Sequence, residues 1–179
     1  MHLRRALRVA WMVAWATWVA SPTAQATVVS AVTVERLTRQ ADEVIVATVV
    51  QSHAQWLNGR IVTDHQLRVV AVMKGRVAPD ASVMLETPGG VVGHLAQSIV
   101  GVPTLGPGGT YILFLSVGPT GLRYLTHLTA SVMPMATDAV SGDVMGTLPE
   151  GLTGGAVVAP RGRVTLEAIE RVVRSVVQP

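Results

Sequence analysis

The chain contains no cysteine and few aromatic residues, with one Phe, two Tyr and four Trp among 179 residues. The lack of cysteine excludes disulfides and any zinc or iron–sulfur site that is built on thiolates. Charged residues are also scarce, at 14% against 49% hydrophobic residues, which excludes a disordered polyelectrolyte. The length suits one folded domain of ordinary size.

The longest N-terminal apolar run is too short to cross a membrane. It follows three arginines and covers residues 9–20, whereas a membrane-spanning helix needs about 20 apolar residues. Small residues then lead to Ala24-Gln25-Ala26. This order is typical of a secretory signal peptide. We therefore predict a cleaved signal at 1–26 and a secreted or periplasmic protein with no stable membrane span.

Removal of this signal changes the charge of the chain. Fourteen basic residues less the three signal arginines leave eleven, which equals the eleven acidic residues. The predicted mature chain is therefore formally neutral. A nucleic-acid-binding protein normally keeps a basic patch for phosphate, so we expect no nucleic-acid partner.

Short apolar segments separated by turn residues predict a mainly β domain at 27–148. Strand formers such as valine dominate these segments, and their spacing favours a small antiparallel Greek-key barrel of the oligonucleotide/oligosaccharide-binding type. The run at 44–50 is nearly all apolar, as expected of a strand that is buried on both faces. The other strands are expected at 60–73, 81–87, 110–117, 122–128, 131–135 and 143–147.

Helical spacing appears at both ends of this domain. Thr33 is a predicted N-cap for a short helix that carries Val34 and Leu37 on one face. After a Gly-rich linker at 149–163, the segment 164–179 predicts an amphipathic C-terminal helix. We expect this helix to dock on its own domain; a helix that binds a partner or a membrane surface is the alternative.

Two segments are candidates for binding. The first is a tight hairpin turn at Asn58-Gly59, the strongest hairpin signal in the chain, with Trp56 beside it. The second is the long Gly- and Pro-rich segment 88–109, because long loops on a folded scaffold often carry function. The predicted binding residues are Trp56, Asn58, Gly59, Pro88, Gly89, Gly90 and His94.

Four stretches together resemble a known family. They are Ala41–Val49, Val70–Gly75, Pro88–Gly90 and Gly108–Leu115. This layout is similar to the netrin-like barrel of the tissue inhibitors of metalloproteinases, and to a group of uncharacterised exported bacterial proteins. The resemblance covers residues 41–128 and implies a netrin-like fold and an encounter with an exported protease.

The inhibitory mechanism of that family does not carry over to this chain. Those inhibitors chelate the zinc of the protease through an N-terminal cysteine. Here the predicted mature chain begins at Thr27, and no cysteine is present. The resemblance therefore implies the fold and a class of partner, but not the chemistry of inhibition.

Catalytic motifs are weak in this sequence. Ser98, His94 and Asp64 could form a triad, and His65 with His94 or His127 could hold zinc. However, no Gly-x-Ser-x-Gly or His-Glu-x-x-His pattern supports either arrangement. We therefore expect neither metal nor cofactor, and a non-enzymatic binding module for another exported or envelope protein, with a protease as one candidate. A metal- or serine-dependent hydrolase and a structural envelope protein are the alternatives.

Overall fold

The computed structural model of the chain describes residues 32–149, 152–153 and 162–178. The predicted signal at 1–26 and most of the predicted linker at 149–163 lie outside the described residues. The helices are α2 (Val34–Gln40), the 3-10 helix η2 (Leu128–Ser131) and α3 (Leu166–Val177). The strands are β1 (Val32–Thr33), β2 (Glu43–Leu57), β3 (Arg60–Lys74), β4 (Ser82–Pro88), β5 (Gly90–Val92), β6 (Leu95–Gln97), β7 (Thr110–Val117), β8 (Arg123–Leu125), β9 (Val132–Thr137), β10 (Val144–Thr147), β11 (Leu152–Thr153) and β12 (Arg163–Thr165).

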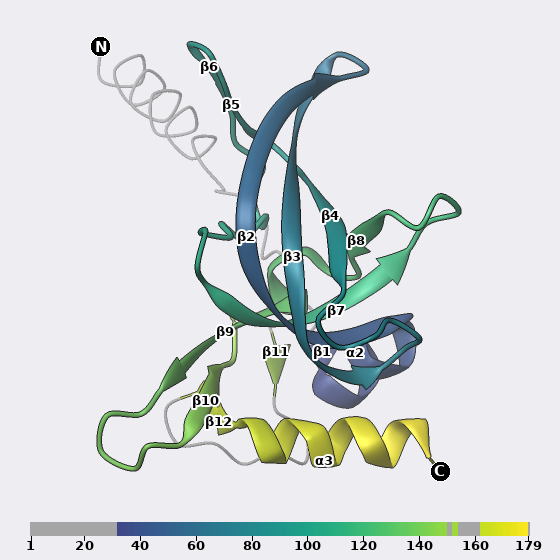
Figure 1. Cartoon of the computed structure of the whole chain (residues 1–179), viewed down its shortest axis with the longest axis vertical. Helices are drawn as coiled ribbons and strands as arrows, with labels where there is room; N and C mark the ends of the chain where they lie inside the picture. Colours follow the sequence, from purple (N-terminus) through teal and green to yellow (C-terminus); the bar gives the residue numbers. More distant parts are fainter. Residues whose placement is uncertain (1–31, 150–151, 154–161, 179) are drawn as a thin grey trace, which may run out of the picture.

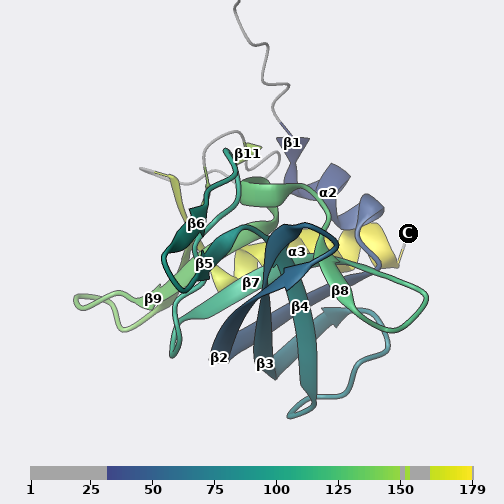
Figure 2. The same ribbon diagram turned by 90° about the horizontal axis from the view of Figure 1, so that it is seen from above.

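Five strands form a partial ring in a mainly β, mixed sheet. The order around the ring is β7, β2, β3, β4 and β8, and β8 pairs again with β7, as Figure 2 shows from above. The expected mainly β class is confirmed. The expectation of an antiparallel sheet is corrected, because β4 and β8 run parallel.

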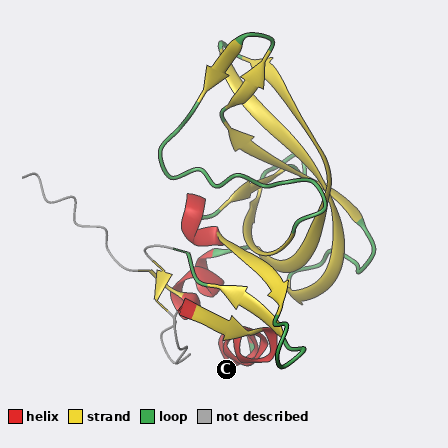
Figure 3. Ribbon diagram, turned by 90° about the vertical axis from the view of Figure 1, so that its left-hand side faces the viewer, coloured by secondary structure: helices red, strands yellow, loops and turns green. Residues whose placement is uncertain are grey.

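The longest ribbon of the sheet is the β2–β3 hairpin. Asn58 and Gly59 have φ angles of 50° and 78°, as a two-residue type I′ turn requires. The hairpin predicted at this position is therefore confirmed. β3 agrees with its prediction to within one residue, whereas β2 is longer than the sequence suggested. Both strands extend to the end of the molecule that lies opposite α3 (Figures 1 and 3).

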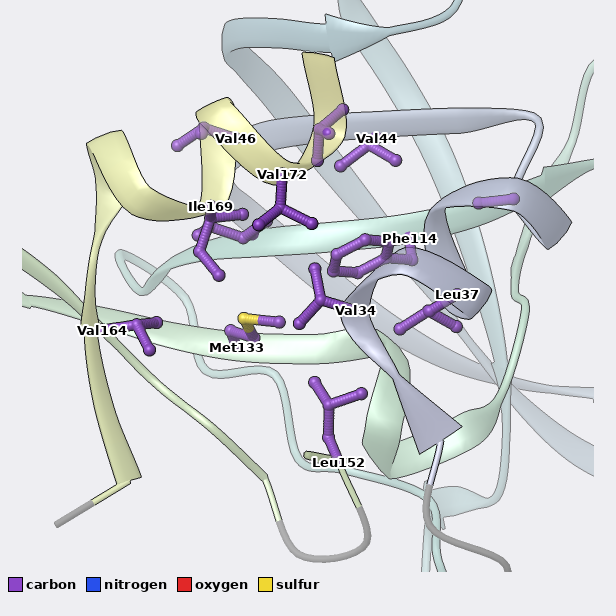
Figure 4. Close-up of a cluster of buried hydrophobic side chains, with 13 residues drawn as sticks. Val34, Leu37, Val44, Val46, Phe114, Met133, Leu152, Val164, Ile169 and Val172 are labelled. Carbon is purple, nitrogen blue, oxygen red and sulfur yellow. The ribbon is translucent and has the colours of Figure 1, made fainter. Parts of the chain in front are cut away.

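The apolar run at the start of β2 separates two buried clusters. Val44 and Val46 contact a cluster around Phe114 that includes residues of α2 and α3 (Figure 4). Ile45, Ala47 and Val49 point the other way, into the interior of the ring. The prediction that this strand is buried on both faces is confirmed for residues 44–47 and 49, whereas Thr48 is half-buried and Val50 is exposed.

Both helices predicted from the sequence are present. Thr33 accepts a hydrogen bond from the Arg36 backbone N–H at 3.2 Å, and Thr165 accepts one from Ala168 at the same distance, so each caps its helix. Ile169, Val172 and Val173 of α3 are buried in the Phe114 cluster. The C-terminal helix therefore docks on its own domain, as we expected. No helix among the described residues is long and apolar enough to span a membrane.

The end of the ring near α2 is closed by charged residues with specific partners. Lys74 donates to the carbonyl oxygens of Thr38 and Ala41 at 2.8 and 2.6 Å, and so caps the end of α2. Glu43 forms an ion pair with Arg123 at 2.7 Å. A Cβ on Gly75 would lie 2.8 Å from the Glu43 side chain. The Lys-Gly pair at the end of β3 thus has a structural role at this end, which we call the closed end.

The segment after β4 differs from its prediction. We expected a long loop at 88–109 with at most one short strand, and it contains the β5–β6 hairpin. The fifth predicted strand, at 122–128, is shorter, because β8 covers only Arg123–Leu125 and η2 follows it. Pairing of β5 with β6 satisfies backbone groups that sequence periodicity alone could not assign.

Candidate functional site

The β5–β6 hairpin folds back over the distal part of the β2–β3 ribbon. The Gly89 N–H donates to the Ile61 carbonyl at 2.8 Å, and the Ile61 N–H donates to Gln97 Oε1 at 2.7 Å. A Cβ on Gly90, whose φ is 138°, would overlap Thr63 Oγ1 and lie 3.0 Å from the Ala54 Cβ. Only glycine allows this close approach of the hairpin to the ribbon.

A cleft of about 380 Å³ lies between the ribbon, the end of β4 and the segment 88–105. Its size is within the range of small-ligand and side-chain pockets. We call this end of the ring, with the cleft and the tips of both hairpins, the open end. The cleft is lined by Ser52, Thr63, His65, Thr87, Pro88, Gly89, Gly90, Val91, Ala96, Gln97, Ser98, Ile99, Val102, Pro103, Thr104 and Leu105.

His65 lies in the wall of the cleft and joins three strands through its ring. Its side chain is 4% exposed. Nδ1 lies 2.7 Å from Ser52 Oγ on β2, and Nε2 lies 3.0 Å from Thr87 Oγ1 on β4. One ring nitrogen of a neutral imidazole donates and the other accepts, so both hydroxyls are satisfied by the neutral form.

Burial also favours neutral His65. Desolvation lowers the pKa of His65 below its ordinary value of 6.5, and the Asp64 carboxylate opposes this effect by raising it. Asp64 is the adjacent residue on β3, so its side chain points to the other face of the strand, where Gln55 donates to it. At neutral pH the imidazole is therefore uncharged, and no Asp, Glu, Lys or Arg of the described residues lines the cleft.

The binding residues predicted from the sequence fall into two groups. Pro88, Gly89 and Gly90 line the cleft. Trp56, which is 51% exposed, lies near the tip of the β2–β3 hairpin, where Asn58 and Gly59 form the turn. His94 is exposed in the turn between β5 and β6. All seven residues therefore belong to the open end, but only three of them line the cleft.

The structure does not bring together the alternative catalytic residues. Ser98 lines the cleft, His94 occupies the β5–β6 turn, and Asp64 lies on the other face of β3. His127 forms a hydrogen bond with Gln40 of α2 and is not among the residues that line the cleft. Within the described ranges, no three His, Asp or Glu side chains cluster as a metal site requires.

Sequence reasoning missed Ser52, Thr63 and Thr87 as cleft residues. Thr63 shares a face of β3 with buried Leu67, and Thr87 shares a face of β4 with buried Leu85. Ser52 lies on β2, opposite His65. A break in the apolar alternation along β3 was visible in the sequence. The cross-strand partners of His65 could not be recognised in the sequence, because they depend on the register of the strands.

Comparison with known proteins adds no family to this description. The chain matches no model of a known protein family, and a search of curated proteins finds no match. The candidate site therefore rests on the geometry of the cleft.

Proposed function

We propose that this chain is an exported binding protein that recognises another exported or envelope protein through its open end. The observation that carries this proposal is the uncharged cleft of about 380 Å³ beside two projecting hairpins. Segments that project from a well-packed sheet commonly form binding sites. The predicted signal peptide at 1–26 supports export.

We also propose that the partial ring is a five-stranded barrel of the oligonucleotide/oligosaccharide-binding or netrin-like type. The strand order β7-β2-β3-β4-β8, together with the β7–β8 pairing, supports this assignment. Proteins of the oligonucleotide/oligosaccharide-binding type bind ligands over their second and third strands and the adjacent loops. The cleft lies over the corresponding strands, β3 and β4.

The chemistry of the open end supports a protein partner. Exposed Trp56 offers the kind of aromatic anchor that is enriched in protein interfaces. The β5–β6 hairpin adds exposed Val91 and Leu95. In the part of the chain that the structure describes, the cleft lining includes no Lys or Arg, which gives no support for a phosphate-bearing ligand. An exported protease is the partner class that the family resemblance implies.

Capture of a partner tests this function. The full chain, expressed with its own N-terminal segment so that cells can process it, is used as bait in an extract of exported and envelope proteins. We expect Thr27 at the mature N-terminus and one specific partner in the eluate. Trp56→Ala should weaken the capture of that partner at least tenfold, whereas Tyr124→Ala, at an exposed residue of β8, should not. Equal capture by all three proteins would refute the open end as the binding site.

A serine-dependent hydrolase is the second candidate, and one observation favours it. Ser52 Oγ lies within hydrogen-bond distance of buried, neutral His65, which is the arrangement of a nucleophile and its base. The other ring nitrogen meets the Thr87 hydroxyl in place of a carboxylate. Labelling with a fluorophosphonate distinguishes the two functions: stoichiometric modification of Ser52 would favour the hydrolase, whereas an unmodified protein supports binding alone.

A further inference from the structure

One edge of β2 has a partner over only part of its length. Along one side β2 pairs with β3 as far as the turn. On the other side it pairs with β7 from Glu43 to Thr48. The Val49 N–H then donates to the Gly109 carbonyl, and the Val49 carbonyl accepts from the Gly108 N–H. Among the described residues, no backbone group pairs with this side of β2 at 51–57. We call this segment the free edge.

The register shows which groups point outward from the free edge. A two-residue hairpin turn closes with a hydrogen-bonded pair, here Leu57 and Arg60, and the register continues without a shift to Gln51. Hydrogen-bonded and non-hydrogen-bonded pairs alternate along the hairpin. The N–H and C=O groups of Ser52, Ala54 and Trp56 therefore point away from β3, and Ser52 and Trp56 have exposed side chains.

The same alternation holds on the opposite strand. Ile61, which pairs with Trp56, directs its N–H to Gln97 and its carbonyl to Gly89. Both of these groups therefore also point out of the β2–β3 ladder. The distal part of β3 is thus covered on its outer side by the segment after β4, whereas β2 has no such cover among the described residues.

The free edge lacks the usual protection against an added strand. Natural edges are commonly protected by charged residues, especially Lys, or by Pro, and residues 51–57 include neither. A register shift between Val49 and Gln51 lies just before this segment, not within it. Ser52 belongs both to the free edge and to the lining of the cleft, so the two features form one continuous surface.

We infer that the free edge of β2 binds an extended, uncharged segment of the partner protein as an added β-strand, with one side chain of that segment entering the cleft. This inference rests on the proposed function and specifies how it recognises its partner. A row of unpaired N–H and C=O groups is complementary to another backbone, and a pocket beside it selects alternate side chains. The uncharged edge and cleft disfavour a charged segment, which would lose its hydration without gaining an ion pair.

Peptide selection tests the inference directly. A random heptapeptide library displayed on phage is selected against the full chain, and the selected peptide is then synthesised with and without methyl groups on alternate backbone nitrogens. We expect uncharged, β-branched sequences, and at least a tenfold loss of affinity on methylation, because methylation removes the donors of a strand. The inference would be overturned if the library yielded no binder. It would also be overturned if the selected peptides kept their affinity when either set of alternate backbone nitrogens was methylated.

A pair of variants at one position locates the binding. Ala54→Pro removes an edge N–H that β3 does not use, and proline is tolerated at such positions; Ala54→Ser keeps that N–H. We expect the proline variant to lose peptide binding at least tenfold and the serine variant to retain it, with circular dichroism spectra like the parent for both. If Ala54→Pro fails to fold, Ala54→Lys takes its place, with the same expected loss. The inference would be overturned if Ala54→Pro, or Ala54→Lys in its place, bound the peptide as well as Ala54→Ser does.

Two further outcomes distinguish failure of the strand-addition inference from failure of the proposed binding function. If the partner captured by the full chain is lost with Trp56→Ala but retained with Ala54→Pro, the proposed function stands and strand addition is wrong. If sedimentation shows a dimer that Ala54→Pro dissociates, the free edge is occupied by a second copy and the inference is overturned. Absence of any captured partner would instead refute the proposed function.

Discussion

The same two strands, β2 and β3, build two ends of the molecule that differ in chemistry. At the closed end, charged residues are paired: Glu43 with Arg123, and Lys74 with the carbonyls of α2. At the open end, His65 is neutral and bonds two hydroxyls. The closed end also packs against two helices, whereas the open end keeps a cleft. Residues that stabilise the fold and residues that we propose for binding are therefore separated along one ribbon.

Two of the four stretches that suggested a family resemblance lie at the closed end, whereas Pro88–Gly90 lines the cleft at the open end. The Ala-Asp-Glu and Lys-Gly stretches that suggested it meet at the closed end, where Asp42 also accepts a hydrogen bond from the Val117 N–H at 2.9 Å. Their roles are structural. The structure therefore assigns these two stretches to packing and hydrogen bonding at the closed end.

The largest effect should come from the ion pair at the closed end. Glu43 is 7% exposed, and Glu43→Ala leaves Arg123 without its partner, so we expect a loss of about 3 kcal/mol in the free energy of unfolding. Urea denaturation measures this loss. Glu86→Ala, on the outer face of β4, is the control and should change stability by less than about 0.5 kcal/mol. Similar losses in both variants would remove the distinction between paired and surface charge.

Lys74→Met should have the next largest effect. The substitution keeps the length of the side chain but removes the two hydrogen bonds to Thr38 and Ala41, so we expect a loss of about 2 kcal/mol. Hydrogen exchange should show that the last turn of α2 opens first. The control Arg68→Met replaces an exposed cation on the same strand and should leave exchange in α2 unchanged.

The open end should respond to pH through His65. Because burial lowers its folded-state pKa, the unfolded chain binds a proton first as pH falls below about 7, and the free energy of unfolding then decreases. Above that pH both states are neutral, and this contribution to stability is fully present. The slope cannot exceed about 1.4 kcal/mol per pH unit.

Denaturation at several pH values between 5 and 8 measures this slope. His65→Gln should reduce it, whereas His53→Gln, at an exposed residue of β2, should leave it unchanged. If both variants keep the full slope, another group is responsible for the pH dependence.

The smallest effect is expected at the tip of the hairpin. Gly59 has a φ of 78°, and a Cβ added there would meet no atom within 4 Å, so Gly59→Ala adds only backbone strain, of about 1 kcal/mol. Thermal or urea unfolding measures this loss. Gly106→Ala, where φ lies outside the left-handed region, serves as the control and should cost less than Gly59→Ala.

Local patterns predicted the elements that local interactions determine. The Asn58-Gly59 turn requires positive φ, and the Thr33 and Thr165 caps need only nearby backbone N–H groups. The nearly continuous apolar run at 44–50 also identified the core part of β2. The β5–β6 hairpin was not predicted, because its strands have three residues each and depend on contacts with β2 and β3 for their position.

The site shows the same division. Pro88, Gly89 and Gly90 were predicted because they begin the long Gly- and Pro-rich segment 88–109, and they line the cleft. Alternation along a strand places His65 on the same face as Leu67. It could not bring Ser52 and Thr87, 13 and 22 residues away in the chain, to the two ring nitrogens.

The amino-acid sequence by itself determined the mainly β class, the hairpin turn and the two helix caps, since each depends on the torsional preferences of neighbouring residues. Only the tertiary structure decided that β4 meets β8 in parallel, that the ring surrounds its own core, and that hydroxyls from β2 and β4 meet an imidazole on β3. These features depend on strand register and long-range packing, where a shift of one residue would exchange the two faces of a strand.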